Sequence, residues 1–594
     1  MFLKCHRRFK DGKEHRYWSI AEKRRCRGGR TVDRHVLYLG EINDSQREEW
    51  VRCIEALDVQ GQRQTRLALL PADRPIPDHA QDYGVQVRLS EFRLQRRRQW
   101  GACWAFCRLW EELKLDEFWG PRLTDSGEGT SWYHVLLLLV AYRLIDPGSE
   151  WRLHRQWFAG SAMGDLLGED YSLAEKNALY RCLDRLLPHK EALFGFLTAR
   201  RQDLFGVRYD VLLYDLTSTC FESDPPFAQG DKRRYGYSRD HRPDCVQVVI
   251  ALIVTAEGFP LAYELLPGNT ADNTTLPQFL EKIEARHGRA RRIWVMDRGI
   301  PTEAHLAQMR QRPVHYLVGT PKGRLSQLEQ ALLMRPWAEA HPSVQVKLLP
   351  RDNELYVWVQ SQARVHKERA MRRRQLKRLW ARLKARQRQR PGYETLLLKL
   401  GAAQKEAGRA RSLVRLTLPD PPPKAQRSRR VSFTFALDKA KLRIIRRREG
   451  RYLLRSNLTE TDPAQLWAFY LQLVEVEGAF KNLKSDLAVR PIFHQLQPRI
   501  EAHIFIAFLA YCLHVTLKEK LRRRAPGLTP RQALEKLAAI QMLDVHFPTT
   551  DGRELIFTRY TQPEPDQQLL LSQLNWTLPA QPPPRLTAKR EIEM

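Results

Sequence analysis

The run Val211-Leu212-Leu213-Tyr214-Asp215 decides the fold, because it predicts a short buried strand that closes on an acid. A second run, Ile293-Trp294-Val295-Met296-Asp297, repeats this pattern farther along the chain. Short apolar runs indicate buried strands, and open α/β sheets bind ligands just beyond the carboxyl ends of such strands. A third acid, Glu477, lies on a helix-like stretch from Tyr470 to Lys484. Three carboxylates that converge in this way can hold two divalent cations, which clamp the attacking and leaving oxygens of a phosphodiester.

The elements around these acids predict an α/β core of the ribonuclease-H-like type. Three successive strands followed by alternating helices and strands are the element order of that fold. The core needs one further helix to complete its site, and the stretch that carries Glu477 is the best candidate. The expected elements are strands at 211–215, 246–255 and 260–266, helix 275–286, strand 292–297, helix 301–312 and strand 315–319.

The segment from residue 321 to residue 460 predicts a β-rich and helical insertion that interrupts this core. Two strands, at 344–349 and 354–360, are expected to pair as a hairpin. The run from Arg364 to Arg390 then holds 13 Lys or Arg against one acid, Glu368. Its apolar residues, Leu376, Leu379, Trp380 and Leu383, recur at helical spacing, which predicts an amphipathic helix and not a disordered tail.

Pro391-Gly392 ends this helix, and a second helical run follows from Glu394 to Arg411. We interpret the pair as a basic helical hairpin that grips DNA, because clustered Lys and Arg on one helix are the electrostatic footprint of a nucleic-acid partner. A solvated helix pair is the alternative. The residues expected to contact DNA from this arm are Arg372, Arg373 and Lys377.

Several local motifs resemble those of DDE transposases from bacterial insertion sequences. Three of them are Tyr214–Thr219, Val295–Gly299 and Pro267–Asp272. The block around Glu477 resembles the family most, because Tyr470, Glu477 and Lys484 fall at the spacing of its tyrosine–arginine–glutamate–lysine signature. Leu473 occupies the arginine position, which is a departure. The chain is thus similar to the insertion-sequence-four superfamily, in its long-insertion branch.

This resemblance implies a cut-and-paste transposase. It implies that Asp215, Asp297 and Glu477 bind two Mg²⁺ or Mn²⁺ ions, and that Tyr470 and Lys484 contact phosphates near the cleaved end. The implied partners are double-stranded DNA, as terminal inverted repeats and as target, and a second copy of the chain in a synaptic complex. No membrane partner is expected.

Two positions near Glu477 leave questions open. Glu475 competes with Glu477 as third ligand, but residues two apart on a helix point about 200° apart, so only one of them faces the site. The spacing to the signature residues favours Glu477. The departure at Leu473 removes one phosphate contact, and Arg490 or Lys481 are the candidates to replace it.

Composition agrees with a nucleic-acid enzyme without proving it. The chain carries 99 Lys plus Arg against 68 Asp plus Glu, a formal charge of +31, which indicates a large anionic partner. Its longest apolar run, Val135–Tyr142, is far short of a membrane span, and the first residues hold no apolar signal segment. The nine cysteines are scattered singly and predict no zinc site. We therefore expect a cytoplasmic, nucleoid-associated bacterial protein.

Changes in composition and in the spacing of apolar residues along the chain predict six regions. Apolar residues at spacings of three and four make the second region mostly helical, and its basic helices are expected to lie on DNA. The regions are 1–80, small and mixed α/β; 81–200, helical; 201–320, first part of the core; 321–460, insertion; 461–525, second part of the core; and 526–594, C-terminal, with a hairpin turning at Asp551-Gly552.

Other histidines and two rival functions complete the expectations. His494 and His503 are expected to be structural, and His241 to approach the site or lie in a surface loop. One rival is a ribonuclease-H-fold nuclease or resolvase that lacks strand transfer. The other is an inactivated transposase retained as a DNA-binding protein, a possibility that Leu473 keeps open.

Overall fold

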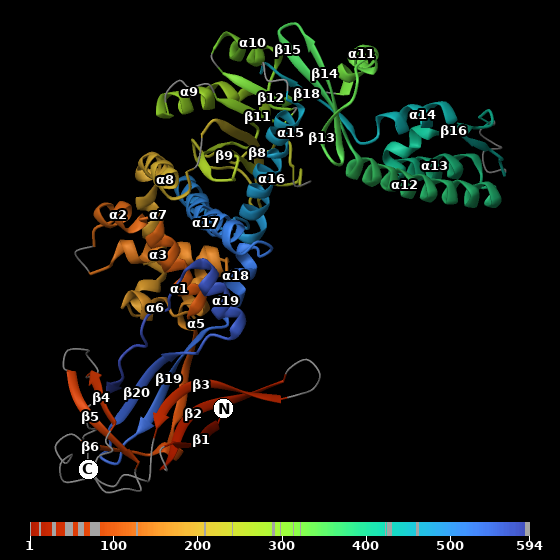
Figure 1. The fold of residues 1–594 in the computed structure, drawn as a ribbon. Helices are drawn as coiled ribbons and strands as arrows, with labels where there is room; N and C mark the ends of the chain where they lie inside the picture. Colours follow the sequence, from red (N-terminus) through yellow and green to blue (C-terminus); the bar gives the residue numbers. More distant parts are fainter. Residues whose placement is uncertain are drawn as a thin grey trace.

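The structure is a computed structural model, and it places the strands of both chain ends together, a helical module in the middle and a large mixed sheet beyond it (Figure 1). A long helical hairpin projects from the far end of that sheet. The residues described are 2–10, 13–25, 31–41, 52–57, 64–71, 84–125, 129–206, 209–239, 242–287, 292–297, 299–312, 314–320, 322–421, 423, 430–458 and 462–587.

The core has the order of helices and strands along the chain that the sequence predicts. Its first five strands lie in the order β10-β9-β8-β11-β12, with β8, β9 and β10 antiparallel and with β11 parallel to both β8 and β12. This is the arrangement of a ribonuclease-H-like core. Its elements are β8 (Val211–Phe221), β9 (Val246–Thr255), β10 (Pro260–Pro267), α9 (Leu276–His287), β11 (Ile293–Met296), α10 (Glu303–Gln311), β12 (His315–Gly319), α15 (Pro463–Leu471) and α16 (Leu473–Lys481).

The strands of the insertion extend this same sheet instead of forming a separate β unit. The edge strand β12 pairs antiparallel with β18, and the order continues β18-β15-β14-β13 to give nine strands. An edge strand presents unpaired backbone groups, which these strands satisfy. The predicted hairpin at 344–360 is confirmed as β14 and β15. The elements are α11 (Lys322–Leu333), β13 (Ala338–His341), β14 (Val344–Arg351), β15 (Glu354–Ser361) and β18 (Arg451–Ser456).

The predicted helical hairpin is also present, between β15 and β18. Its two helices pack through an apolar seam that includes Leu379, Leu383, Leu396 and Leu400, and Trp380 packs edge-on against Phe435. Most of its cations therefore face outward. The elements are α12 (Gln362–Gln389), α13 (Tyr393–Ala407), β16 (Val414–Thr417), β17 (Thr434–Leu437) and α14 (Lys439–Arg448).

The helical module is built around one long apolar helix, α17 (Gln497–Arg524). By length and composition α17 could cross a membrane, but 94% of its most apolar window is buried inside the protein. It packs against α1, α3 and α7, and burial on all sides explains why its middle turns are apolar all around. The other helices are α1 (Gly101–Glu112), α2 (Leu115–Trp119), α3 (Trp132–Ile145), α4 (Glu150–Arg152), α5 (Phe158–Gly160), α6 (Met163–Leu167), α7 (Lys176–Leu186), α8 (Lys190–Phe205), α18 (Pro530–Ala538) and α19 (Pro565–Leu574).

The two ends of the chain share a seven-stranded sheet of order β6-β5-β4-β21-β20-β19-β7. The hairpin expected at Asp551-Gly552 joins β19 to β20, and Gly552 takes φ +82° in its turn. Within 1–80 a mixed α/β region was expected, but the described residues form strands. These segments pair with one another in sheets, which accounts for the difference. A separate three-stranded sheet of order β1-β2-β3 consists of β1 (Phe2–Lys10), β2 (Lys13–Arg25) and β3 (Thr31–Glu41). The strands of the seven-stranded sheet are β4 (Arg52–Leu57), β5 (Gln64–Pro71), β6 (Gly84–Val87), β7 (Arg93–Gln99), β19 (Gln541–Pro548), β20 (Glu554–Tyr560) and β21 (Arg585–Leu586).

Candidate active site

Two of the predicted acids lie at one level of the core sheet. β8 pairs with β11 only as far as Tyr214 opposite Met296, so Asp215 and Asp297 are the next residue on each strand. Asp215 does not end its strand as expected, because β8 continues along β9 to Phe221. Parallel pairing of β8 and β11 thus brings the two carboxylates together although the chain separates them widely.

The third acid reaches the same place from α16, which packs across β8 and β9. The three acids line one cleft of about 310 Å³, together with aromatic side chains and an arginine of the insertion. Asp297 and Glu477 are exposed and Asp215 is half-buried. The cleft is lined by Asp215, Asp297, Ser361, Arg364, Tyr452, Trp467, Tyr470, Leu471, Leu473, Val474, Val476 and Glu477.

Among the described residues that line the cleft, three acids stand against a single Lys or Arg, Arg364. Burial, and then the charges of Asp297 and Glu477, raise the pKa of Asp215 to about 7. A hydrogen bond from the Leu216 amide (2.8 Å) and the Arg239 guanidinium act in the opposite direction. Arg239 itself is paired with Asp272 at 2.6 Å. Neighbouring carboxylates that raise the pKa of Asp215 in this way favour a bound cation.

The structure places Glu477 in the cleft and turns Glu475 away from it. Glu475 Oε2 accepts a bond from Lys518 Nζ at 2.5 Å, on α17. Two residues of separation on α16 account for this opposite orientation. Glu475 thus has a partner within the protein, whereas Glu477 faces the two aspartates.

The signature residues do not lie on one straight helix as their spacing suggested. The helix breaks at Gln472 between α15 and α16, and residues 482–486 form a π-helical turn. A π turn changes the rotation per residue and so shifts the face that follows it. Tyr470 lines the cleft, but Lys484 is half-buried and is not among the lining residues.

Leu473, which stands where the signature has an arginine, also lies in apolar surroundings. Leu473 is 9% exposed and packs into the main core while it lines the cleft. Neither suggested replacement lines that cleft: Arg490 borders a different cleft, beside Cys220 and Phe221, and Lys481 is exposed. His241 lies outside the described residues.

The predicted arm residues divide into one structural and two exposed side chains. Arg372 is 8% exposed, and its Nε donates to Glu449 at 2.5 Å, so its guanidinium is engaged inside the protein. Arg373 and Lys377 are exposed on α12. The burial of Arg372 arises because α12 packs its base against the turn before β18.

Sequence reasoning missed Arg364 and the aromatic wall of the cleft. Tyr452, Trp467 and Tyr470 pack with ring centroids 5.2–6.2 Å apart. Arg364 was one of 13 cations in a run, and nothing in its local sequence distinguished it. Tyr452 comes from β18 and the other two from α15, so only the fold brings them together.

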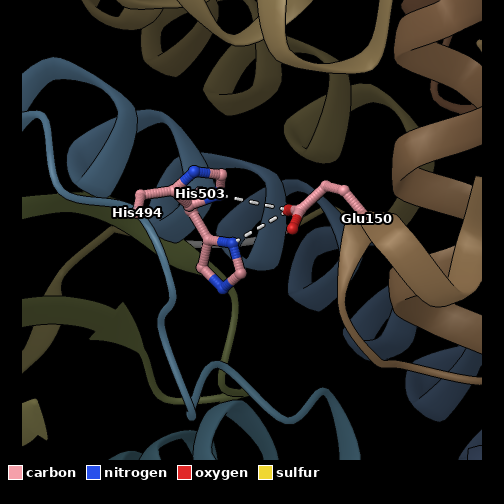
Figure 2. Close-up of side chains that lie close together, drawn as sticks. All are labelled: Glu150, His494 and His503. Carbon is pink, nitrogen blue, oxygen red and sulfur yellow. Dashed lines mark hydrogen bonds and ion pairs between the residues drawn. The ribbon is translucent and has the colours of Figure 1, made fainter. Parts of the chain in front are cut away.

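A second group of ligand-type side chains lies outside the cleft, in the interior (Figure 2). Glu150 Oε1 is 3.3 Å from His494 Nε2 and 3.2 Å from His503 Nδ1. Among the described residues, these three form the one His/Cys/Asp/Glu group whose candidate ligand atoms all lie within 4.8 Å of one another. The acids of the cleft are therefore more widely spaced than this group.

The buried group already holds its own cation. The Arg143 guanidinium lies 3.9 Å from Glu150 Oε1 and 3.5 Å from His503 Nδ1, and it also donates to the Ala488 carbonyl. His503 Nε2 donates to the Val489 carbonyl at 3.2 Å. Burial, and then Arg143, lower the pKa of His503 to about 4, so the ring is neutral at pH 7. The group is a structural network that ties α3, α4 and α17 to the loop after Glu477.

Three acids on a ribonuclease-H-like sheet define a class of DNA-processing enzymes, and comparison with known families agrees. The family model "Transposase DDE domain" matches residues 208–513, just over half of the chain. The chain belongs to this family. No curated protein matches it.

Two solved structures are among those similar to the chain. A pre-cleavage Mos1 transpososome matches at 13% identity and TM-score 0.14, covering 32% of this chain and 61% of that one. A Mos1 transposase paired-end complex with the left transposon end matches at 14% identity and TM-score 0.13, covering 33% and 65%. The chain thus spans less than two thirds of each, and TM-scores this low establish no common fold.

Proposed function

We propose that the protein is a cut-and-paste DDE transposase that cleaves DNA at the ends of its own insertion sequence and joins those ends to a target. One observation carries the proposal: Asp215, Asp297 and Glu477 share a cleft whose described lining holds three acids and one arginine, and the two neighbouring acids raise the pKa of Asp215. A cleft in which acids outnumber the cations beside them favours a cationic ligand. The match to the transposase family supports the same reading.

The donor set fits Mg²⁺ or Mn²⁺. All three side chains offer hard carboxylate oxygens, which these ions prefer over sulfur or nitrogen ligands. When bound, two such ions activate the attacking oxygen and stabilise the leaving oxygen of a phosphodiester. The role of Asp215, Asp297 and Glu477 is to hold these ions. The Leu216 amide donates a hydrogen bond to the carboxylate of Asp215 and so orients it.

Other residues of the chain hold and position the DNA. The aromatic wall of Tyr452, Trp467 and Tyr470 gives the cleft a rigid apolar side. The exposed cations Arg373 and Lys377 on α12 lie on DNA phosphates outside the cleft, and Lys484 also contacts phosphate. The +31 charge of the chain favours association with the duplex.

The biological setting follows from the same chemistry. The proposed partners are the terminal inverted repeats and target DNA, held by two copies of the chain so that both ends are synapsed. The protein acts in the bacterial cytoplasm on the nucleoid. We place it in the insertion-sequence-four superfamily through Tyr470, Glu477 and Lys484, with Leu473 as the departing position.

Strand cleavage on a labelled duplex that carries the element's own end tests the proposal. The wild type is compared with Asp215→Ala, Asp297→Ala and Glu477→Ala, in Mg²⁺, in Mn²⁺ and with chelator. Glu475→Ala is the matched control, because it removes an acid from the same helix that faces away from the cleft. We expect metal-dependent nicking at the element boundary that is lost in the three variants and kept in the control.

The same assay separates the two rival functions. Nicking without joined product in the presence of a target plasmid would favour a nuclease. Tight, salt-sensitive binding of the end with no cleavage in any metal would favour a DNA-binding relic.

A further inference from the structure

The cleft holds one cationic side chain that the proposed chemistry has not used. Among the described residues that line it, Arg364 is the single Lys or Arg, beside three acids and the aromatic wall. It comes from the first turn of α12, so the insertion contributes directly to the cleft. A phosphodiester that enters between three carboxylates needs a cation beside it as well as any metal.

Arg364 is held in place by contacts that leave its outer nitrogens available. Its Nε donates to Glu368 Oε1 at 3.1 Å, and its guanidinium lies over the Tyr452 ring at 4.9 Å. Glu368 in turn accepts from the Gly450 amide at 2.8 Å. The two terminal nitrogens of Arg364 hold no bond to any residue within the described part of the chain, and the side chain is 49% exposed.

The backbone beneath this arrangement is fixed by Gly450. Gly450 takes φ +70°, a conformation that favours glycine. A Cβ there would lie 2.3 Å from Val365 Cγ2, so α12 and the start of β18 approach as closely as a glycine allows. The start of α12 is thereby locked to the core sheet, and with it the direction in which Arg364 points.

We propose that Arg364 binds a phosphate of the DNA strand in the cleft and supplies, from the insertion, the cation that Leu473 does not supply from α16. Both residues line the same cleft, so a phosphate there is within reach of either position. A guanidinium held by its Nε and stacked on an aromatic ring presents its remaining donors as a planar pair, which matches phosphate geometry. This inference rests on the proposed function, because it takes DNA as the ligand of the cleft.

Binding of a fluorescein-labelled duplex that carries the element's end, in Ca²⁺, tests the proposal independently of cleavage. Arg364→Ala is expected to bind roughly tenfold more weakly, with a salt-dependence slope smaller by about one. Arg364→Lys keeps the charge but not the planar donors, and should recover part of the affinity. The control is Arg388→Ala, an exposed arginine on the same helix roughly 36 Å farther along.

The cleavage rate at saturating duplex separates the cleft from the arm. It should fall in Arg364→Ala and remain at the wild-type value in Arg388→Ala, whatever Arg388 contributes to binding. Adding Leu473→Arg to Arg364→Ala should restore part of both affinity and rate, since it returns a cation to the same phosphate.

Three results overturn the proposal. The first is an Arg364→Ala variant with wild-type affinity and salt slope. The second is equal loss of rate in the Arg364 and Arg388 variants. The third is a folded double variant, with the melting temperature of the wild type, that recovers nothing. A wild type that binds ends but cleaves nothing would instead refute the transposase chemistry and leave the binding comparison to decide on Arg364.

Discussion

The two clusters of ligand-type side chains in this molecule differ in how closely the described cations pair with their carboxylates. In the interior, Glu150 lies with His494 and His503, and Arg143 is 3.9 Å from its carboxylate. In the cleft, Asp215 faces two further acids, and Arg239, whose charge acts on Asp215, is already paired with Asp272. Compactness alone would select the buried cluster as the metal site.

The difference shows that acids without close cationic partners indicate a functional site better than close spacing of ligand-type side chains does. Burying an unpaired charge is costly, so a structural cluster acquires its partners from the fold. A site that must take up a cation leaves its acids without such partners and tolerates the repulsion until the ligand arrives. The predictions below test this contrast.

The largest effect is expected from neutralising the acids of the cleft. Asp215→Asn, Asp297→Asn and Glu477→Gln should each lower single-turnover cleavage by roughly a thousandfold or more, since the bound metals stabilise several kcal/mol of transition-state charge. The melting temperature should stay equal or rise, because each change relieves like-charge repulsion. A variant that loses activity only because it unfolds would contradict a role of the cleft acids in chemistry and not in stability.

The second prediction concerns the buried cluster, where stability and not chemistry should suffer. Arg143→Leu leaves Glu150 buried without its cation and should cost about 3–5 kcal/mol of unfolding free energy. Urea denaturation followed by tryptophan fluorescence measures this. The control is Arg152→Leu, which breaks an exposed pair with Asp146 and should cost at most about 1 kcal/mol. Equal costs for both variants would contradict a neutralising role for Arg143.

The third prediction is a pH dependence of stability that originates in the same cluster. The pKa of His503 is about 4 in the folded protein, below its unfolded value of about 6.5. The unfolded chain therefore binds more protons between these values, so stability is fully present above about pH 6.5 and falls as the pH drops toward 4. The loss should be a few kcal/mol at most, and His503→Gln should flatten the melting-temperature profile in that window. A profile unchanged by the substitution would exclude His503 as the source.

The smallest expected effect is stabilisation by metal. Mn²⁺ at about ten times its dissociation constant should stabilise the wild type by roughly 1.4 kcal/mol, visible as a small rise in melting temperature. Asp215→Asn should lose this rise, while His494→Gln should keep it, because the interior cluster is already neutralised. The reverse pattern would assign the metal to the interior cluster and contradict the proposed difference between the two clusters.

The sequence predicted the core well because its signals are local. Each of β8, β9 and β11 is an apolar run of its own, and their order alone specifies a ribonuclease-H-like sheet. The helical hairpin was likewise predicted from the spacing of Leu379 and Leu383 within one segment. The sequence did not indicate that β18 would pair with β12, because edge pairing depends on which backbone groups the rest of the fold leaves open.

The site was predictable in its acids and not in its surroundings. Asp215, Asp297 and Glu477 follow recognisable local patterns, and the structure brings all three to one cleft. The π turn at 482–486 moved Lys484 away from the position that regular helical spacing gave it. Arg364 lies more than one hundred residues from Glu477 along the chain, so only tertiary packing reveals that they share a cleft.

The shared sheet of the two chain ends has a consequence for how the protein forms during synthesis. Arg98 on β7 bonds to Asp544 on β19, 446 residues later. At bacterial rates of about 5–20 residues per second, a ribosome needs roughly 20 to 90 s to make the intervening chain. Through that interval β4 and β7 wait with open edges, which are sites of intermolecular pairing. The shared sheet, whose first strands are made early, is thus among the last to close.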